Sequence, residues 1–409
     1  MKIGLFNYSD NLGGAARASY RIHKSLINQG IKSNLYVSKK SIPDISIQES
    51  PNKFDRYFSN LRPQLVSKFI KLMNPKINSY SSISILPSNW PKFINSSDID
   101  VVHLNWINAE MMSIEDIAKI SKPIVWTLHD MWPFLGSKHL SKKTDPIELT
   151  KIKKISFFKN LFNIDNWTYN RKKKSWTKPI QIVTPSKWLE NCVIESELMK
   201  DWPVTTIPHP IDTDFWKPYS DKNFRSRFNI NNNKKILIYG ADGGIESKNK
   251  GFDLLLKSLE KMEDYFNDFV LCVFGEDKPI KLKTNFPIIN LGRITNDKKL
   301  RQIYCASDLC IVPSRQESFC QVALEAQSCG TPVLAFSIGG LIDIVDHKNT
   351  GYLVNPFDTE LFSHYIKSFI KNKNVDHLRI NARKRVETLY SMSTVAKKYI
   401  NLYKKISLK

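Results

Sequence analysis

The chain has 409 residues, of which 42% are hydrophobic, so two globular domains with separate cores are the starting expectation. Lys and Arg outnumber Asp and Glu by 61 to 39, a formal net charge of +22 that favours polyanions, anionic membranes or phosphorylated small molecules as partners. The sequence has no membrane-spanning run and no signal-peptide pattern, which predicts a cytoplasmic protein. Its six cysteines include no CxxC pair, and we expect them to be buried free thiols.

The first half of the sequence alternates buried strands with helices. Strands are expected at 2–8, 35–37, 100–104, 123–128 and 181–184, and helices at 17–28, at 113–119 and after Ser186, which could cap the last of them. This alternation predicts a parallel sheet. Between the first strand and helix, the turn at Gly13 and Gly14 would let a phosphate or sugar approach backbone amides. A tight turn that simply needs positive φ is the alternative.

After a proline-rich run at 203–218, which predicts an interdomain linker, the alternation starts again. Strands are expected at 236–239, 269–274, 288–291, 309–312 and 332–335, and helices at 251–262, 300–306 and 321–328. A second Rossmann-like domain follows from this pattern. The predicted boundaries are 1–205 for the first domain, 206–385 for the second, and 386–409 for a helical tail that could return to the first domain.

Two glutamates, Glu317 and Glu325, frame the start of the predicted helix 321–328 and follow a buried strand. The carboxyl ends of parallel strands are where such folds bind ligands, and amides at a helix start favour a diphosphate. Glu317 could accept hydrogen bonds from sugar hydroxyls, while Glu325 could hold a ribose diol. Taken singly, each glutamate also fits a solvated surface charge.

The motifs of both halves resemble family 4 of the retaining glycosyltransferases, which have the GT-B fold: two α/β, Rossmann-like domains that face each other across a cleft. The resemblance rests on the following segments: Gly13-Gly14-Ala15-Ala16-Arg17, Asp100-Val101-Val102-His103-Leu104, Thr127-Leu128-His129-Asp130-Met131-Trp132-Pro133, Lys250-Gly251-Phe252-Asp253-Leu254-Leu255, Leu291-Gly292-Arg293, the two glutamates, Gly330-Thr331-Pro332-Val333 and Thr350-Gly351-Tyr352-Leu353-Val354. The first-half motifs are similar to those of bacterial capsule and exopolysaccharide transferases.

The resemblance implies roles for individual residues. Catalytic roles fall to His129 beside the reacting carbon, Lys250 at the diphosphate and Glu317 at the donor sugar, and donor-binding roles to Gly13, Gly14, Arg293, Ser318, Phe319 and Glu325. Many relatives carry an Arg where this chain has Ala241, so Arg293 is the candidate second cation and Lys248 the alternative. His129 as an ordinary strand-end histidine and Arg293 as a structural ion pair stay open, and His103 is expected to be structural.

The implied reaction moves a sugar from a nucleoside diphosphate sugar to a hydroxyl of a glycan or lipid-linked acceptor, with retention and without a metal cofactor, in surface polysaccharide synthesis. Asp98-Ile99-Asp100 and Asp212-Thr213-Asp214 match a metal-binding pattern of a different fold, and we expect neither to bind metal. A nucleotide-sugar hydrolase or epimerase on the same fold is the nearest alternative. A nucleic-acid-binding protein fits the charge, but no known module supports it, so no nucleic-acid partner is expected.

Residues 53–76 combine six basic side chains with many apolar ones, and Asp55 is the stretch's one acid. This composition is typical of helices that lie at an anionic membrane surface. We therefore expect peripheral attachment to the inner face of the cell membrane as a further property of the first domain. A helix packed on its own domain is the alternative interpretation.

Overall fold

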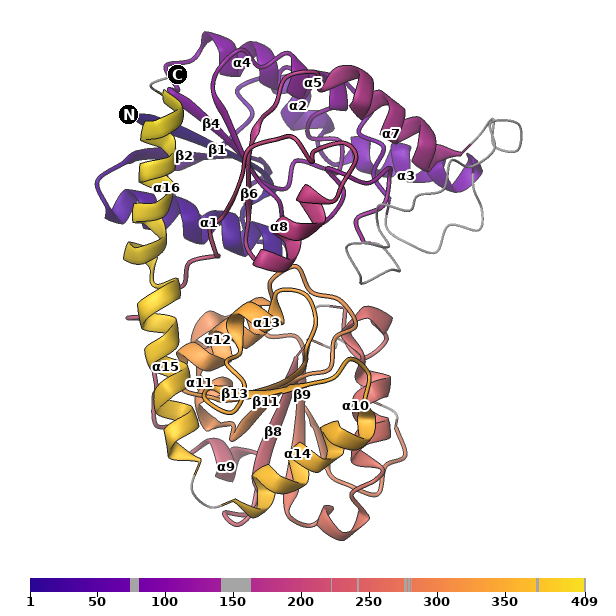
Figure 1. Cartoon of the computed structure of the whole chain (residues 1–409), viewed down its shortest axis with the longest axis vertical. Helices are drawn as coiled ribbons and strands as arrows, with labels where there is room; N and C mark the ends of the chain where they lie inside the picture. The colour runs from indigo at the N-terminus through magenta and orange to yellow at the C-terminus, as the bar shows by residue number, and fades with distance from the viewer. Residues whose placement is uncertain are drawn as a thin grey trace. The chain divides into compact units, whose positions relative to one another are not determined.

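The computed structural model describes the whole chain except residues 74–80, 141–162, 222, 241–242, 276–277, 279, 281, 373–374 and 408–409. The chain divides into two compact units. Unit 1 comprises Met1–Pro210 together with Met392–Lys409, and unit 2 comprises Ile211–Ser391. The boundaries expected from the sequence were at residues 205 and 385. Each unit has its own parallel sheet with helices around it (Figure 1).

Unit 1 contains a sheet of seven described strands, all parallel, in the order β3-β2-β1-β4-β5-β6-β7. The strands are β1 (Lys2–Ser9), β2 (Lys32–Lys39), β3 (Ile47–Glu49), β4 (Val101–Leu104), β5 (Ile124–Thr127), β6 (Gln181–Thr184) and β7 (Val204–Thr206). The helices are α1 (Gly13–Asn28), α2 (Lys53–Phe58), α3 (Leu61–Met73), α4 (Trp90–Ser96), α5 (Ile114–Ala118), α7 (Ile164–Ser175), α8 (Lys187–Ile194) and α16 (Met392–Ser407).

Alternate residues of β1 face the two layers of helices that cover the sheet, as the period of a strand requires. Ile3 and Leu5 lie in a cluster with Tyr399 and Tyr403 of α16, while Phe6 belongs to the cluster on the opposite face. The C-terminal segment of the chain therefore completes the core of unit 1, and α16 packs beside α1 (Figure 1).

Unit 2 contains a sheet of six described strands in the order β10-β9-β8-β11-β12-β13, again all parallel. The strands are β8 (Lys235–Gly240), β9 (Phe269–Phe274), β10 (Ile288–Asn290), β11 (Leu309–Val312), β12 (Val333–Phe336) and β13 (Gly351–Val354). The helices are α9 (Phe224–Arg227), α10 (Phe252–Leu259), α11 (Asp297–Ala306), α12 (Gln321–Ser328), α13 (Leu341–Ile344), α14 (Thr359–Lys371) and α15 (Asp376–Tyr390), with 3-10 turns η1 (Lys248–Lys250) and η2 (Glu263–Tyr265).

Three local expectations hold in outline and differ in detail. The expected turn at Gly13 and Gly14 is shorter than predicted, because α1 already begins at Gly13, whose φ of +81° is the positive value that the alternative required. The boundary between the units, after Pro210, lies inside the predicted linker, although β7 and the buried Trp216 belong to the two cores. The tail is helical and returns to unit 1 as expected, but it forms two helices, because Ser391 is extended between α15 and α16.

Other expectations are confirmed. The six cysteines are free thiols, five of them buried. Ser186 caps α8 by accepting a hydrogen bond from the Leu189 amide at 3.3 Å. Ala241, where relatives carry an Arg, lies outside the described residues.

Candidate active site

The order of strands in unit 2 reverses between β8 and β11, which are neighbours in the sheet although β9 and β10 come between them in sequence. The helices that follow β8 and β11 therefore leave in opposite directions, and ligands of open α/β sheets bind in the crevice this creates at the carboxyl ends of the strands. Lys250 follows β8, and Glu317 follows β11. The topology thus brings two of the predicted catalytic residues to one place.

Lys250 and Glu317 form an ion pair. The Lys250 Nζ lies 2.7 Å from Glu317 Oε1, and Ser314 Oγ donates to the same carboxylate oxygen at 2.9 Å. Both side chains are partly exposed, at 29% for Lys250 and 11% for Glu317, so solvent or a ligand can reach them. The ammonium is a preorganised positive charge for an anionic ligand, while the carboxylate is an acceptor for hydroxyl groups.

The two loops that carry this pair are fastened to each other. The Arg315 amide donates to the Asn249 carbonyl at 2.8 Å, and Asn249 Nδ2 donates to the Gln316 carbonyl at 3.0 Å. The Arg315 guanidinium also binds both carboxylate oxygens of Asp253, at 2.7 and 2.6 Å. Bidentate pairing of this kind fixes geometry as well as charge. The positions of Lys250 and Glu317 are therefore set by backbone contacts and not by their own ion pair alone.

Glycines allow the backbones around Glu317 to approach closely. At Gly251, φ is +68° and a Cβ would lie 1.9 Å from the Pro313 carbonyl oxygen. At Gly339 and Gly340, which follow β12, a Cβ would lie 2.0 Å from the Glu317 oxygen and 2.5 Å from the Ser318 oxygen. The Gly340 amide donates to Glu317 O at 2.9 Å. Sequence reasoning missed Gly339 and Gly340, although a glycine pair within three residues of a buried strand was the available signal.

The other predicted donor-binding residues of this loop have different surroundings. Glu325 is 2% exposed and accepts a hydrogen bond from Tyr304 Oη at 3.2 Å. The Phe319 ring is buried and lies edge-on to Tyr390, with ring centroids 6.0 Å apart, so the ring belongs to the core. Ser318 is half-buried. Between this loop and α12, Cys320 has a φ of +96°, an unfavourable conformation for a residue with a side chain.

Arg293 is exposed and follows β10, the edge strand of the sheet. Strand β9 lies between β10 and β8, which Lys250 follows, and β11, which Glu317 follows, is the next strand beyond β8. Arg293 lies at the same carboxyl edge, so it could contact a different part of an extended ligand.

Tyr239, near the end of β8, is a residue that the sequence did not single out. Its hydroxyl is buried, and among the residues that the structure describes it has no hydrogen-bond partner. Burial, together with the nearby carboxylates of Glu317 and Asp253, raises the pKa of Tyr239. A buried hydroxyl without a partner is costly and calls for an explanation such as a ligand.

In unit 1, His129 follows β5 and Asn105 follows β4. The Asn105 Nδ2 donates to the His103 carbonyl at 3.4 Å, which leaves Asn105 Oδ1 to accept from His129 Nε2 at 3.0 Å. Burial lowers the pKa of His129 to about 4, so the ring is neutral near pH 7. With the proton on Nε2, Nδ1 of the neutral ring is an acceptor.

His209 stacks on His129, with ring centroids 5.0 Å apart, and burial lowers its pKa as well. Sequence reasoning assigned no role to His209. Asp130, beside His129 in the chain, accepts hydrogen bonds from Trp106 Nε1 at 2.8 Å and pairs with His139 Nδ1 at 2.6 Å. Burial acts to raise the pKa of Asp130, but His139 and these hydrogen bonds outweigh it and lower the pKa.

Gly13 and Gly14 begin α1 after β1, and the strand order of unit 1 reverses between β1 and β4. They therefore lie at the position in this sheet that corresponds to Lys250 in the other. No side chain caps this helix start. His103, by contrast, is fully buried and bonded to Thr127 and Tyr403, which confirms the structural role expected for it.

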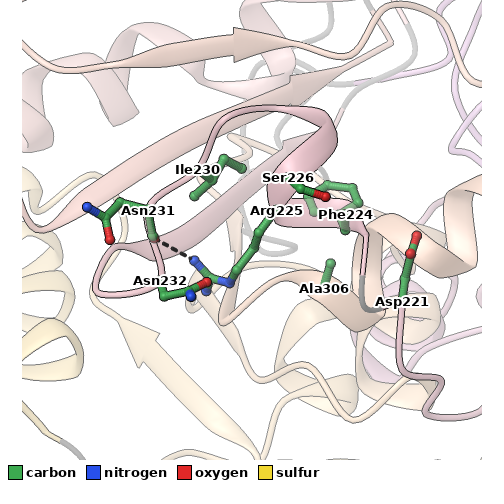
Figure 2. A pocket seen from close by; sticks show the side chains of 8 residues that line it. All are labelled: Asp221, Phe224, Arg225, Ser226, Ile230, Asn231, Asn232 and Ala306. Atoms are coloured by element: carbon green, nitrogen blue, oxygen red, sulfur yellow. Dashed lines mark hydrogen bonds between the residues drawn. The ribbon is translucent and has the colours of Figure 1, made fainter.

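A cavity of about 580 Å³ lies at the other end of unit 2. Its lining comes mainly from residues 221–232, which precede β8, and from Ala306, which precedes β11 (Figure 2). Arg225 is the cation of this cavity, and its guanidinium donates to the carbonyls of Asn231 at 3.0 Å and Lys234 at 2.9 Å. These bonds hold a loop in place, and the cavity is distant from the carboxyl ends of the strands.

Within the described ranges, no group of three or more His, Cys, Asp or Glu side chains is arranged to hold a metal ion. Carboxylates in both Asp-x-Asp matches have protein partners: Asp98 pairs with Lys2 at 2.5 Å, Asp100 accepts from the Lys2 amide at 2.7 Å, and Asp212 accepts from the amides of Asp214 and Phe215, both at 3.0 Å. None of the described helices has the length and apolar character needed to cross a bilayer.

Residues 12–215 match the family model Glycosyltransferase Family 4, and residues 220–385 match the model Glycosyl transferases group 1. The chain therefore belongs to glycosyltransferase family 4, the glycosyl transferases group 1. Curated relatives include the lipopolysaccharide 1,2-N-acetylglucosaminetransferase of Salmonella typhimurium, 26% identical over 54% of this chain and 60% of the relative. The D-inositol 3-phosphate glycosyltransferase of Mycobacteroides abscessus is 33% identical over 42% of this chain and 40% of the relative. The chain thus spans less than two thirds of either relative.

Solved structures confirm the GT-B fold expected from the sequence. Sucrose-phosphate synthase of Thermosynechococcus elongatus matches with a TM-score of 0.66 and 17% identity, over 99% of this chain and 98% of that one. HepE of Anabaena, solved in complex with UDP and glucose, matches with a TM-score of 0.65 and 17% identity, over 98% and 99% of the two chains. At 17% identity, these two matches are evidence for the fold alone.

Proposed function

We propose that the protein transfers a sugar from a nucleoside diphosphate sugar to a hydroxyl of a glycan or lipid-linked acceptor, with retention of the anomeric configuration, in the synthesis of a surface polysaccharide. The observation that carries the proposal is the ion pair between Lys250 and Glu317. Its Nζ and Oε1 atoms lie 2.7 Å apart, and it follows the two strands between which the strand order of unit 2 reverses. Membership of the glycosyltransferase family supports it. So do two relatives: HepE, solved with UDP-glucose, and the Salmonella lipopolysaccharide transferase.

In this proposal Lys250 stabilises the negative charge that develops on the departing diphosphate. A fixed ammonium in a partly water-excluded site is more effective than solvent, because it needs no reorganisation during the reaction. Without donor, Glu317 neutralises that ammonium. With donor bound, the diphosphate competes for Lys250, and Glu317 accepts hydrogen bonds from sugar hydroxyls. Gly251, Gly339 and Gly340 let the neighbouring backbones approach the Glu317 loop closely and so hold it in place.

We propose that Glu325 binds the ribose of the donor and that Arg293 lies at or near the outer phosphate. The backbones of Ser318 and Phe319 contact the donor. In unit 1, Gly13 and Gly14 offer the backbone at the start of α1, and His129 acts on the sugar as a neutral acceptor through Nδ1. No protein nucleophile is proposed. As in the family that the sequence resembles, the departing phosphate would help to deprotonate the acceptor on the same face.

We also propose that the reaction needs no metal ion. The support is that the Lys250 ammonium lies where the diphosphate is expected and that Asp98, Asp100 and Asp212 of the two Asp-x-Asp matches have protein partners. Activity should then persist in EDTA. A purified protein that loses turnover with the chelator and regains it with Mn²⁺ or Mg²⁺ would show that the diphosphate is held differently.

The function is tested by a thermal-shift screen with a panel of nucleoside diphosphates and their sugars, because a ligand that binds the folded protein raises its apparent stability. Lys250→Met and Lys257→Met, which removes an exposed lysine of α10, form a matched pair: the shift should be lost in the first variant and kept in the second. The hit is then incubated with glycan and lipid-linked acceptors. Acceptor-independent release of free sugar would indicate a hydrolase, and no shift with any nucleotide sugar would refute the proposal.

For localisation we propose the cytoplasmic side of the cell, with peripheral attachment to the inner face of the membrane. A lipid-linked acceptor would be presented there. The support comes from the cationic and apolar stretch that begins at residue 53.

A further inference from the structure

Helices α2 and α3 expose a row of apolar side chains. The members are Phe54, Tyr57, Leu61, Leu65, Phe69 and Leu72. Tyr57 is 78% exposed, Leu65 60% and Leu72 80%, and the α3 members recur at intervals of four, four and three residues. Residues at such intervals share one face of a helix. A row of this length is more than the scattered exposed apolar residues of ordinary surfaces.

This row is not the face that anchors the helices to unit 1. A second set of residues, Val66 and Ile70, is buried in a small cluster with Ile83 and Ile164. Arg62 is also buried and donates to the carbonyls of Glu110, at 3.0 Å, and Leu86, at 2.6 Å. The helices are thus attached through one side and leave the apolar row to solvent.

The charges exposed on α2 and α3 all have the same sign. Lys53, Arg56, Lys68 and Lys71 are exposed. Asp55 is the one acid between residues 53 and 73, and it is buried. Its carboxylate accepts from the Asn89 amide at 2.8 Å and lies 3.7 Å from Arg62 Nη1. The structure therefore removes the single negative charge from this surface, which the sequence alone does not show.

We propose that the α2–α3 face, defined as the six exposed apolar residues and four exposed cations named above, docks on an anionic lipid bilayer. The inference rests on the proposed function, since a lipid-linked acceptor lies in such a bilayer. The apolar side chains enter the region between headgroups and acyl chains, and the cations contact the lipid phosphates.

The composition of the face favours a bilayer over other partners. A polyanion such as RNA would use the cations and the aromatic rings, but it would gain nothing from exposed Leu65 and Leu72. A second copy of the chain would bring four more cations against these four, and like charges across an interface are unfavourable. An anionic bilayer is complementary to both the charge and the apolar row.

The proposal is tested with the full chain and two kinds of vesicle, one of neutral lipid and one with added phosphatidylserine, in a sedimentation assay without donor. Binding should be much stronger to the anionic vesicles and should fall as salt is added. The double variant Lys68→Gln/Lys71→Gln should bind roughly 30-fold more weakly, about fivefold for each charge near an anionic surface. Equal binding to both kinds of vesicle would overturn the proposal.

A matched control separates this face from the general positive charge of the protein. Lys397 and Lys398 are exposed on α16 of the same unit, so Lys397→Gln/Lys398→Gln loses the same charge elsewhere. This control should bind nearly as well as the unmodified chain. If it loses as much binding as the α3 variant, attraction is non-specific and the face is not the docking site.

The apolar row has a test of its own. Leu65→Ser/Leu72→Ser should bind anionic vesicles at least tenfold more weakly, the minimum expected from taking one buried Leu away from the membrane. Ile380→Ser, in the other unit and also exposed, should have no effect. If the Leu variant binds anionic vesicles as well as the parent chain, the apolar row does not dock on lipid. If the variant instead loses self-association in sedimentation velocity, the row is an interface between copies of the chain. Nucleotide-induced thermal shifts of all these variants should be unchanged, so failure of vesicle binding would leave the transferase proposal standing.

Discussion

The ammonium of Lys250 and the carboxylate of Glu317 lie 2.7 Å apart, although 67 residues separate them in the chain. If Lys250 stabilises the departing diphosphate, Lys250→Met should lower turnover by roughly 10² to 10³, since one preorganised electrostatic partner has about that effect. Steady-state kinetics with the donor found by the nucleotide screen measure it. Lys257→Met, which removes an exposed cation from the neighbouring helix α10, should keep near-normal turnover.

The assignment to Lys250 has a clear competitor in Arg293. If Lys250→Met keeps near-normal turnover while Arg293→Met is inactive, the diphosphate is held at the edge of the sheet and the role given to Lys250 is wrong. Both variants should melt cooperatively near the temperature of the parent chain, because both side chains are partly or fully exposed.

Glu317 and Glu325 should respond differently to the same change. Glu317→Gln is expected to lower turnover mainly, because its partners are the sugar and Lys250. Glu325→Gln is expected to weaken binding of the free nucleoside diphosphate mainly, if its carboxylate holds the ribose. Calorimetric titration of the nucleotide and turnover at saturating donor measure the two effects. An equal loss of nucleotide affinity in both variants would contradict the division of roles.

Tyr239→Phe removes a buried hydroxyl that has no partner among the described residues. The variant should be more stable by about 1 kcal/mol or more, because the cost of desolvating that group disappears. Urea unfolding without ligand measures this. If the donor is the missing partner, the same variant should bind the nucleotide sugar more weakly than the parent. A loss of stability would instead show that the hydroxyl is satisfied in the free protein.

Asn105→Asp places a carboxylate beside His129 Nε2 in place of an amide oxygen. An opposite charge at that distance should raise the pKa of His129 by about 1 to 3 units from its lowered value near 4. Imidazole nitrogen chemical shifts should show the Nε2-protonated tautomer in the parent and the higher pKa in the variant. The acid limb of the pH profile of turnover should move upward with it. An unchanged pKa would mean that Asn105 does not hold the ring.

Unit 1 should lose stability in mild acid. Burial lowers the pKa of His23 to about 4, of His103 to about 3 and of His129 to about 4, so the folded chain keeps these rings neutral while the unfolded chain protonates them near pH 6.5. Stability is therefore full above that pH and falls as the pH drops toward the folded values. The loss should be about 1 kcal/mol for each histidine between about pH 6 and 5.

Tryptophan fluorescence during urea unfolding measures this loss, because eight of the nine tryptophans belong to unit 1 and Trp216→Phe removes the other. His103→Gln should reduce the pH dependence of the unfolding free energy by the contribution of one histidine. Equal unfolding midpoints at neutral and mildly acidic pH would show that the rings are protonated in the folded chain.

The sequence by itself determined ten of the thirteen described strands, about half of the helices and the residues that carry the family resemblance, while β3, β7 and β13 were missed. Buried strands such as 309–312 and 269–274 can be located because they are continuous apolar runs, and α10 because its Lys250-Gly251 start precedes an amphipathic pattern. The choice of Glu317 was possible for the same local reason: it follows a predicted strand and precedes a predicted helix. Local patterns of this kind depend only on neighbours in the chain.

Only the tertiary structure decided which of these residues meet. The pairing of β8 with β11 joins Lys250 to Glu317 and leaves Arg293 at the edge strand, and no local pattern encodes the order of strands. The stacking of His209 on His129 and the closeness of Gly340 to Glu317 depend on contacts between distant segments. The same holds for Asp55, whose charge the fold buries, so that the surface of α2 and α3 is purely cationic. Burial and long-range contact are properties of the packed chain, because they arise only when separate elements exclude water from one another.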